Sequence, residues 1–469
     1  MKTECTTQRV EFHPHSRRQV TGAFDGGTIT SDGGGLLLRE VEDRVGVVAS
    51  FASCFNDHRN PNLTEHSVET LVAQRVFGLA LGYEDLNDHE ELRRDPLLAL
   101  MAGKTDCEGK DRPRRRDRGK PLAGKSTLNR LELATPEGAA GHRYKKIAID
   151  EAKAADVFVD VFLRAHGEAP KEIVLDLDAT DDPLHGAQEG RFFHGYYGNY
   201  CYLPLYIFCG DFLLCAKLRA SDCDGAAGSV EEVERIVTRI RERWPSVKII
   251  LRGDSGFCRE GLMAWCETHG VDYVFGLAKN SRLVETIRDQ LECVRARFDE
   301  TEHAARCFKD FSYRTRTSWS RSRRVVAKAE HLAKGSNPRF IVTTLDGDAQ
   351  VLYETVYCAR GDMENRIKEQ QLYLFADRTS AATMRANQIR LWFASVAYTL
   401  LQLLRHTALK GTRLARAQCH TIRLKLLKIG ARVRITARRI WVSFTGACPY
   451  ADLVRVIVER LKALPVMRC

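Results

Sequence analysis

The sequence predicts an α/β fold in which the first strand of a sheet carries acidic residues. Between residues 172 and 276, apolar runs and turn signals indicate the order strand, strand, strand, helix, strand, helix, strand. The first three strands follow one another through short connections, which predicts an antiparallel meander. Two of the strands end in an aspartate. Because a carboxylate at the end of a buried strand is costly without a partner, we expect these strands to build a functional site.

The first strand of this set contains two aspartates on the same face. It begins as an apolar run at 173–177, and period-two counting places Asp176 and Asp178 on one side of it. A divalent cation is the obvious partner for such a carboxylate. Asp181 and Asp182 follow closely, so spacing alone leaves all four open. The nearby histidines, His185 and His194, are interpreted as structural or as facing a nucleic acid.

Two further stretches carry acidic residues. The apolar strand at 247–251 runs straight into Asp254, and a buried strand at this position argues against an adhesion function for the triplet Arg-Gly-Asp at 252–254. Later, Tyr357, Arg360, Glu364 and Lys368 share one face if a helix over about 362–375 extends back by one turn.

Taken alone, a helix face on which a carboxylate lies between basic residues is most often a row of solvent-exposed salt bridges. Together with Asp178 and Asp254, however, Glu364 suggests a three-carboxylate centre that holds two Mg²⁺ ions, with Mn²⁺ as a possible substitute. Such a centre catalyses in-line phosphoryl transfer.

The charge distribution predicts a nucleic-acid partner. The chain has 469 residues, enough for more than one domain, with a formal net charge of +11 and a pI near 9.0. Residues 104–146 contain thirteen Lys and Arg against six Asp and Glu, and residues 378–451 contain fourteen Lys and Arg and no acidic residue. The second segment also has regular apolar spacing, which indicates a folded basic surface facing phosphates.

Several other classes of protein are disfavoured. The fifteen cysteines are scattered without a C-x-x-C pair, and the first twelve residues contain no apolar signal region, so we expect a reduced cytosolic protein. The longest apolar stretch, 391–404, is too short and too interrupted for a membrane span and predicts a core helix.

Two glycine-containing stretches suggest phosphate binding without requiring it. Residues 119–126 fit the P-loop pattern, but a basic segment precedes them where a buried strand is required, and Pro121 removes a backbone N–H donor. We predict instead a loop that leads into a helix, with Ser126 as its N-cap. The run Asp32-Gly33-Gly34-Gly35 is more often a turn than a phosphate cradle.

The acidic motifs resemble those of a known family. Asp-x-Thr at 178–180, Asp254 and Tyr-x₂-Arg-x₃-Glu at 357–364 resemble the insertion-sequence DDE transposases with the Tyr-Arg-Glu-Lys signature, typified by insertion sequence 4. DATDDPLHGAQEG (178–190), ALGYEDLNDHEELRRDP (80–96) and LAGKSTLNRLE (122–132) look more narrowly like the insertion sequence 1380 family. The resemblance extends from about Asp32 to residue 450.

This resemblance implies an RNase H-like catalytic core with a β-rich insertion, a helical N-terminal DNA-binding region and a basic helical C-terminal region. Asp178, chosen over Asp176 because of the Asp-x-Thr match, would join Asp254 and Glu364 as catalytic residues and metal ligands. Tyr357 and Arg360 would contact DNA near the cleaved end. The lysine of the signature falls where Gln371 stands, and Lys368, one turn earlier, is the candidate substitute. Trp319 in the insertion is the candidate for stacking on a flipped base.

The implied activity is Mg²⁺-dependent cleavage at terminal inverted repeats followed by joining to target DNA. The partners would be double-stranded DNA and a second copy of the chain, in the bacterial cytoplasm at the nucleoid. The expected regions are N-terminal end recognition (1–165), the first part of the core (166–280), the insertion (281–350), the Glu-bearing helix (351–385) and the basic C-terminal region (386–469). The predicted ribbon at 432–444, with Arg434 and Arg438, would grip DNA.

Two alternative functions remain open at this stage. One is a regulator that binds DNA without chemistry, descended from a transposase. The other is a hydrolytic nuclease of the same fold, which would share the three carboxylates and differ only in lacking strand transfer.

Overall fold

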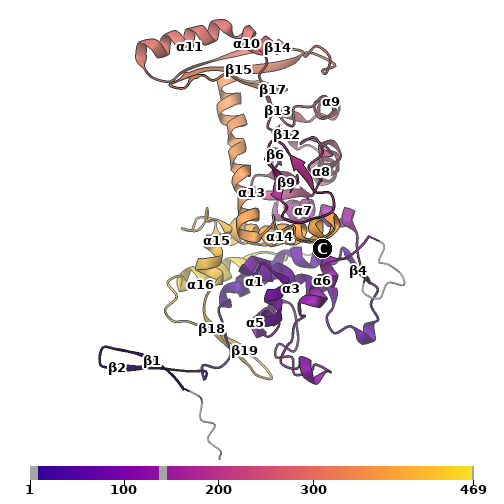
Figure 1. Ribbon diagram of the computed structural model, residues 1–469, viewed down its shortest axis with the longest axis vertical. Coiled ribbons are helices and arrows are strands. Elements are labelled where there is room, and N and C mark those ends of the chain that lie inside the picture. Colours follow the sequence, from indigo (N-terminus) through magenta and orange to yellow (C-terminus); the bar gives the residue numbers. More distant parts are fainter. Residues whose placement is uncertain (1–8, 137–144, 467–469) are drawn as a thin grey trace, which may run out of the picture.

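A mixed nine-stranded sheet lies at the centre of the computed structural model, which describes residues 9–136 and 145–466 (Figure 1). Along its main path the strand order is β11-β10-β6-β12-β13-β17-β15-β14, and β16 pairs with β15. The strands are β6 (Glu172–Ala179), β10 (Leu205–Cys209), β11 (Phe212–Lys217), β12 (Lys248–Gly253), β13 (Asp272–Leu277), β14 (Ala305–Tyr313), β15 (Arg323–Leu332), β16 (Gly335–Ser336) and β17 (Arg339–Thr343).

The pairing directions agree with the predicted order of elements. β6, β10 and β11 form the antiparallel meander, whereas β12 lies parallel to β6 and β13 lies parallel to β12. Apolar side chains of these strands are buried on both faces of the sheet, as expected for parallel strands covered by helices. The α/β class is therefore confirmed.

One part of the predicted meander differs. The second of the three predicted strands corresponds to the aromatic run at 192–208, which divides in the structure into β8 (Phe192–His194), β9 (Asn199–Tyr202) and β10. β8 and β9 form a small separate sheet with β7 (Asp182–Pro183), in the order β7-β9-β8. Gly195 and Gly198 turn the chain between β8 and β9, and Pro204, which has no N–H to donate, separates β9 from β10.

Helices cover both faces of the central sheet. Figure 1 shows α8 (Ser229–Arg243) and α9 (Glu260–Thr268) on one side and α13 (Gly361–Leu374) on the other. α7 (Glu151–Ala165) packs against β11 and α8. The Glu-rich start and Arg-rich end of α8 follow the preference of the helix dipole, as the sequence indicated.

The segment at 281–350 extends the same sheet. It begins with α10 (Ser281–Thr286) and α11 (Arg288–Thr301), after which β14, β15 and β17 continue the sheet beyond β13 with antiparallel pairing. In Figure 1 it stands at the end of the molecule opposite the N-terminal helices. The insertion is thus β-rich and shares hydrogen bonds with the core.

Residues from both ends of the chain pack together below the sheet. The N-terminal helices are α1 (Leu36–Val45), α2 (Val47–Ala52), α3 (Val68–Leu81), α4 (His89–Leu92), α5 (Pro96–Met101) and α6 (Lys125–Glu132). They pack against α14 (Met384–Leu404) and α16 (Ala451–Ala463), and α15 (Cys419–Ile422) packs against α13 and α14. α14 is buried along most of its length, as predicted for a core helix.

The three glycines after Asp32 serve this packing. They form a buried 3₁₀ turn, η1 (Gly33–Gly35), and a Cβ on Gly34 would lie 1.7 Å from the carbonyl oxygen of Leu426. Asp32 pairs with Lys428 at 2.6 Å and accepts a hydrogen bond from Tyr83. This stretch is therefore a turn that brings the two ends of the chain into close contact, and the prediction of a turn is confirmed.

The P-loop-like stretch also has a structural role. No strand lies directly before α6. Between α5 and α6 the chain contains only the 3₁₀ turn η4 (Arg115–Asp117). The side chain of Glu90 accepts a hydrogen bond from the backbone N–H of Lys125 at the start of α6, where a phosphate would have to bind. The N-cap is Gly124, so the prediction of Ser126 was wrong by two residues.

Two hairpins project from this lower body. β1 (Arg9–His15) and β2 (Arg18–Ala23) form an exposed arm, and β18 (Ala431–Ile435) pairs with β19 (Ile440–Phe444) and with β3 (Ile29–Thr30) (Figure 1). The remaining elements are β4 (Phe55–Asp57), β5 (Ile147–Ile149), η2 (Pro61–Leu63), η3 (Leu86–Asp88), η7 (Arg405–Leu409) and η8 (Arg423–Leu427). Within the described ranges, no helix has the length and apolar character needed to cross a bilayer.

Candidate active site

Asp178 and Asp254 lie side by side at the ends of two adjacent parallel strands. In the register of β6 and β12, Leu177 pairs with Gly253, and each aspartate follows one residue later. Neighbouring strands are about 4.8 Å apart, so the two carboxylates emerge next to one another. The backbone N–H of Gly256 donates to Asp254 Oδ1 at 2.8 Å and fixes its orientation. The two strand-end aspartates are thus brought together.

Glu364 reaches this pair from a longer helical segment than expected. The prediction was a helix from about residue 362 with one additional turn. In the structure, α12 (Ala349–Val351), the π-helical η5 (Leu352–Tyr357), the 3₁₀ turn η6 (Cys358–Arg360) and α13 follow without a break. Gly361 has helical dihedral angles and does not interrupt the segment. Its continuity places Tyr357, Arg360 and Glu364 on the side facing β6 and β13.

Arg360 lies between two of the three carboxylates. Its guanidinium is 3.7 Å from Asp178 Oδ1 and 2.8 Å from Glu364 Oε1. Burial raises the pKa of Asp178 to about 7, and the negative charges of Asp254 and Glu364 act in the same direction while Arg360 opposes them. The pKa of Asp178 therefore depends on both other carboxylates, and Arg360 offsets part of their repulsion.

Tyr357 approaches the site over a glycine. A Cβ on Gly276 would lie 2.6 Å from the Tyr357 hydroxyl and 2.9 Å from the backbone nitrogen of Ser255. Only a residue without a side chain leaves room for the tyrosine at this point of β13. Burial raises the pKa of Tyr357, and the nearby Asp254 adds to the effect. Tyr357, Arg360 and the three carboxylates therefore form one cluster.

Asp176, the first alternative to Asp178, has a different partner. Arg252 stands opposite it in the strand register and binds both carboxylate oxygens, at 2.5 and 2.7 Å. Arg252 also donates to the carbonyl of Val356 at 2.6 Å, which ties the helical segment to the sheet. Both side chains are buried. The carboxylate of Asp176 is thus occupied by a structural ion pair, a contact that sequence spacing did not reveal.

Gln371 anchors the other end of the Glu-bearing helix. Its side-chain amide donates to Asp182 Oδ1 at 3.0 Å and to the carbonyl of Asp181 at 3.3 Å. Asp182 is completely buried, which raises its pKa to about 8. Lys368, one turn earlier, is exposed. Gln371 thus connects α13 to the turn after β6.

A second anchor, absent from the sequence analysis, fixes α13 to the C-terminal region. Glu369 is fully buried and accepts from Arg366 at 2.5 Å, from Arg405 at 2.7 Å and from the backbone N–H of Cys419 at 3.1 Å. Its position five residues after Glu364 gave no signal of this role, because Arg405 and Cys419 come from η7 and α15.

The remaining predicted site residues lie elsewhere. Trp319 is only 4% exposed, packs edge-on against Tyr313 and has Arg323 over its ring, so in this conformation it offers no face for stacking. Arg434 and Arg438 are exposed on the β18–β19 hairpin, at the opposite end of the molecule from the insertion (Figure 1). His185 is exposed, and His194 is half-buried in β8.

The three carboxylates are the kind of ligand that binds a hard divalent cation, although their positions in this structure do not form a closed coordination site. Among the residues that the structure describes, no group of three His, Cys, Asp or Glu side chains is close enough to hold a metal ion. Asp178, Asp254 and Glu364 nevertheless share one electrostatic environment, and the positive charge of Arg360 acts against their repulsion. Carboxylate oxygens are the ligands that Mg²⁺ and Mn²⁺ prefer. The chemistry of the three side chains therefore fits these ions.

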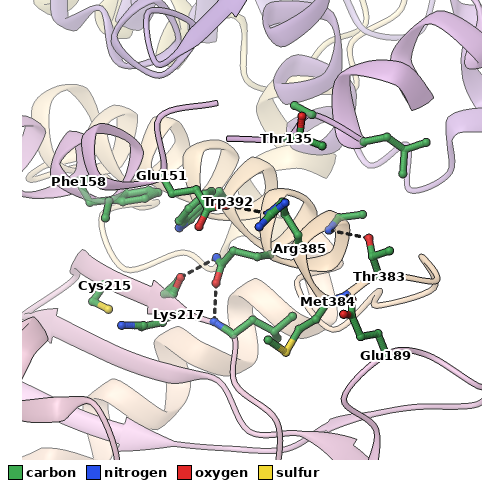
Figure 2. A pocket seen from close by; sticks show the side chains of 18 of the residues that line it. Thr135, Glu151, Phe158, Glu189, Cys215, Lys217, Thr383, Met384, Arg385 and Trp392 are labelled. Atoms are coloured by element: carbon green, nitrogen blue, oxygen red, sulfur yellow. Dashed lines mark hydrogen bonds and ion pairs between the residues drawn. The ribbon is translucent and has the colours of Figure 1, made fainter. Parts of the chain in front are cut away.

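A cavity of about 700 Å³ lies away from this cluster, between α7, β11 and the start of α14. Figure 2 shows Glu151, Lys217, Arg385 and Trp392 around it, and Arg385 pairs with Glu151 at 3.0 Å. None of the three carboxylates lines it. The candidate active site therefore lies outside this cavity.

The buried carboxylates predict that stability of the metal-free protein falls as pH rises. Folded-state pKa values of about 7 for Asp178 and about 8 for Asp182 exceed the ordinary 3.8, so the native state binds more protons than the unfolded state in between. Their contribution is fully present below about pH 4 and is lost as pH rises through about 7 to 8. Urea unfolding at several pH values should show a shallower decline for Asp178→Asn, and identical slopes would contradict the assignment.

Comparison with protein-family models gives a match over nearly the whole chain. The family model described as Transposase DDE domain group 1 matches residues 12–466. A search of the curated proteins finds none that matches the chain. Among solved structures, one match is a piggyBac transposase synaptic complex with hairpin DNA determined by cryo-EM, at 12% identity and a TM-score of 0.34, covering 84% of this chain and 79% of that one.

Proposed function

Because the chain belongs to the family of transposase DDE domains of group 1, we propose that it cleaves the ends of a transposon at terminal inverted repeats and joins them to target DNA. The strand order β11-β10-β6-β12-β13, with two antiparallel pairings followed by two parallel ones, supports an RNase H-like core for this activity. The motifs at 178–190, 80–96 and 122–132 favour the insertion sequence 1380 group.

One observation carries the proposal. Two aspartates end adjacent parallel strands, and a helix places a glutamate and an arginine against them. Asp178, Asp254 and Glu364 would hold two Mg²⁺ ions, or Mn²⁺ in their place. When bound, such ions activate the attacking oxygen and stabilise the leaving oxygen in phosphoryl transfer.

The protein's own groups would orient the DNA. Gly256 holds the Asp254 carboxylate, and Gln371 and Glu369 hold the helix that carries Glu364. Arg360, released from Asp178 and Glu364 once a cation is bound there, would be free to contact a phosphate, with the Tyr357 hydroxyl beside it. This dual role explains why an arginine lies inside a carboxylate cluster.

Binding of double-stranded DNA would involve the exposed basic surfaces at the two chain ends. The β18–β19 hairpin carries Arg434 and Arg438, and the lower body also contains the described residues 104–136 of the basic segment. Two copies of the chain would bridge two transposon ends, in the bacterial cytoplasm at the nucleoid. Lys368 is exposed on α13 and remains a candidate phosphate contact.

Incubating the purified protein with the end DNA of its own element, a supercoiled target and Mg²⁺ tests the proposal. Joined products at the repeat boundary are expected for a transposase. Cleaved ends without joined products would identify a hydrolytic nuclease, and binding without cleavage in Mg²⁺ or Mn²⁺ would identify a regulator.

Arg434→Ala should weaken DNA binding roughly equally for all sequences and lower the salt dependence of log K by about one unit, because Arg434 is exposed and positioned for a phosphate. Fluorescence anisotropy with end DNA and unrelated duplex at several salt concentrations measures both effects. A loss confined to the end sequence would instead indicate base recognition.

A further inference from the structure

Four aromatic rings are exposed together on the small β7-β9-β8 sheet. The exposed fractions are 50% for Phe192, 49% for Phe193, 86% for Tyr196 and 43% for Tyr200. Scattered exposed apolar residues are ordinary, but several large rings on one hairpin indicate a binding surface. Phe193 and Tyr200 are cross-strand partners on one face of the hairpin, whereas Phe192, paired with the buried Cys201, faces the other side. Phe193, Tyr200 and Tyr196, which lies in the turn, are called the aromatic platform below.

The platform is joined directly to the end of the first catalytic strand. Tyr197, in the turn of the hairpin, donates a hydrogen bond to the carbonyl of Ala179 at 3.3 Å, one residue after Asp178. Asn199 donates to Asp181 Oδ2 at 3.1 Å. Burial raises the pKa of Tyr197 to about 12, and the charges of Asp181 and Asp178 contribute. The platform therefore lies within electrostatic reach of the candidate active site.

The hairpin holds its rings in fixed positions. Phe193 and Tyr200 are cross-strand partners, with ring centroids 5.4 Å apart in an edge-to-face arrangement. Gly198 closes the turn with a φ of +68° and donates to the carbonyl of His194. Ser221 donates to the carbonyl of Phe192 and ties the hairpin to the core. A rigid arrangement limits the entropy lost when a ligand is bound.

A cation accompanies the rings. The guanidinium of Arg191 lies 3.9 Å from the centroid of Tyr200 and donates to the carbonyl of Gly186 at 2.8 Å. Aromatic rings beside a fixed cation suit unpaired nucleotides, because a base can stack on the exposed rings of Phe193 and Tyr196 while the phosphate contacts the guanidinium beside Tyr200. A protein partner with an apolar face would not require the cation, nor the adjacent carboxylate cluster.

We propose that the aromatic platform binds unpaired nucleobases of the DNA strand that is processed at Asp178, Asp254 and Glu364, an inference that rests on the proposed function. For a phosphodiester of a duplex to reach the buried end of β6, the bases beside it must leave the base stack. Stacking on exposed rings stabilises these displaced bases. The platform takes the place that the sequence analysis assigned to Trp319, whose ring is buried.

Fluorescence anisotropy in EDTA, where no cleavage takes place, tests the platform with the full-length protein. The probes are a labelled oligothymidylate of about twelve nucleotides and a duplex of the same length. Tyr196→Ala and Phe193→Ala should each weaken binding of the single strand by roughly 5- to 100-fold, and duplex binding by less than about twofold. Tyr196→Phe keeps the ring and should bind like the wild type. Phe24→Ala is the matched control, since Phe24 is 94% exposed next to the β1–β2 arm.

Several results would overturn the inference. Wild-type protein that fails to bind the oligothymidylate, equal losses for both probes, or an equal loss in Phe24→Ala would each do so. A changed oligomeric state in Tyr196→Ala, measured by light scattering, with unchanged binding would assign the rings to a protein interface. The proposed function fails separately, because it requires cleavage and joining in Mg²⁺, whereas the platform is measured without either.

Discussion

Asp254→Ala is expected to lower the rate of end cleavage by at least about 10³-fold while leaving end binding unchanged. Asp254 follows β12 and lies beside Asp178, and the N–H of Gly256 donates to its carboxylate at 2.8 Å. Alanine therefore removes the proposed metal ligand without disturbing a buried ion pair. Cleavage of labelled end DNA under single-turnover conditions measures the rate, and anisotropy measures binding.

The matched control is Asp299→Ala. Asp299 has a side chain 63% exposed on α11 in the insertion, where its loss changes the same charge far from the cluster. It should cleave at the wild-type rate within about twofold. If Asp254→Ala still cleaves, the metal site is not at the ends of β6 and β12. If it loses end binding together with cleavage, Asp254 has a structural function.

The order of elements around the site could be predicted because each strand is a short apolar run bounded by turn residues. The same reasoning could not assign Asp176, since its role depends on which residue of β12 lies opposite it. Only the register, with Arg252 across from Asp176, shows that this carboxylate is paired. Period-two counting placed both aspartates on one face and could not separate them.

The helical segment shows a different limit. Glycine has a low helix propensity, yet Gly361 is helical because tertiary contacts outweigh a penalty of about 1 kcal/mol. Gln371 and Glu369 are ordinary helix residues in the sequence. Their partners, Asp182 and Arg405, come from distant segments, so these anchors follow only from the packing.

Trp319 illustrates how composition misleads. It lies in a segment that alternates aromatic and basic residues, a pattern that suits nucleic acid, but its ring packs against Tyr313 in the core of the insertion. The rings of the hairpin at 192–200 were interpreted as strand residues. Their exposure depends on the turn at Gly195 and Gly198, which separates them from the central sheet.

The second large effect concerns stability and separates the two aspartates of β6. Asp176→Ala should lower the free energy of unfolding by about 3–5 kcal/mol, because it leaves the buried guanidinium of Arg252 without its carboxylate. Asp178→Ala should cost no stability in the metal-free protein, since burial, Asp254 and Glu364 all disfavour its ionised form. Urea unfolding in EDTA measures both values.

The double variant Asp176→Ala/Arg252→Met tests whether the stability that Asp176→Ala loses is due to the unpaired charge of Arg252. Removing both partners of a buried ion pair is often close to neutral, so the double variant should recover most of the stability that Asp176→Ala loses. Asp178→Ala should instead abolish cleavage with the fold intact. The opposite pattern, in which Asp176→Ala is stable and inactive while Asp178→Ala cleaves, would make Asp176 the first metal ligand. Arg252 would then have to release it when a cation binds.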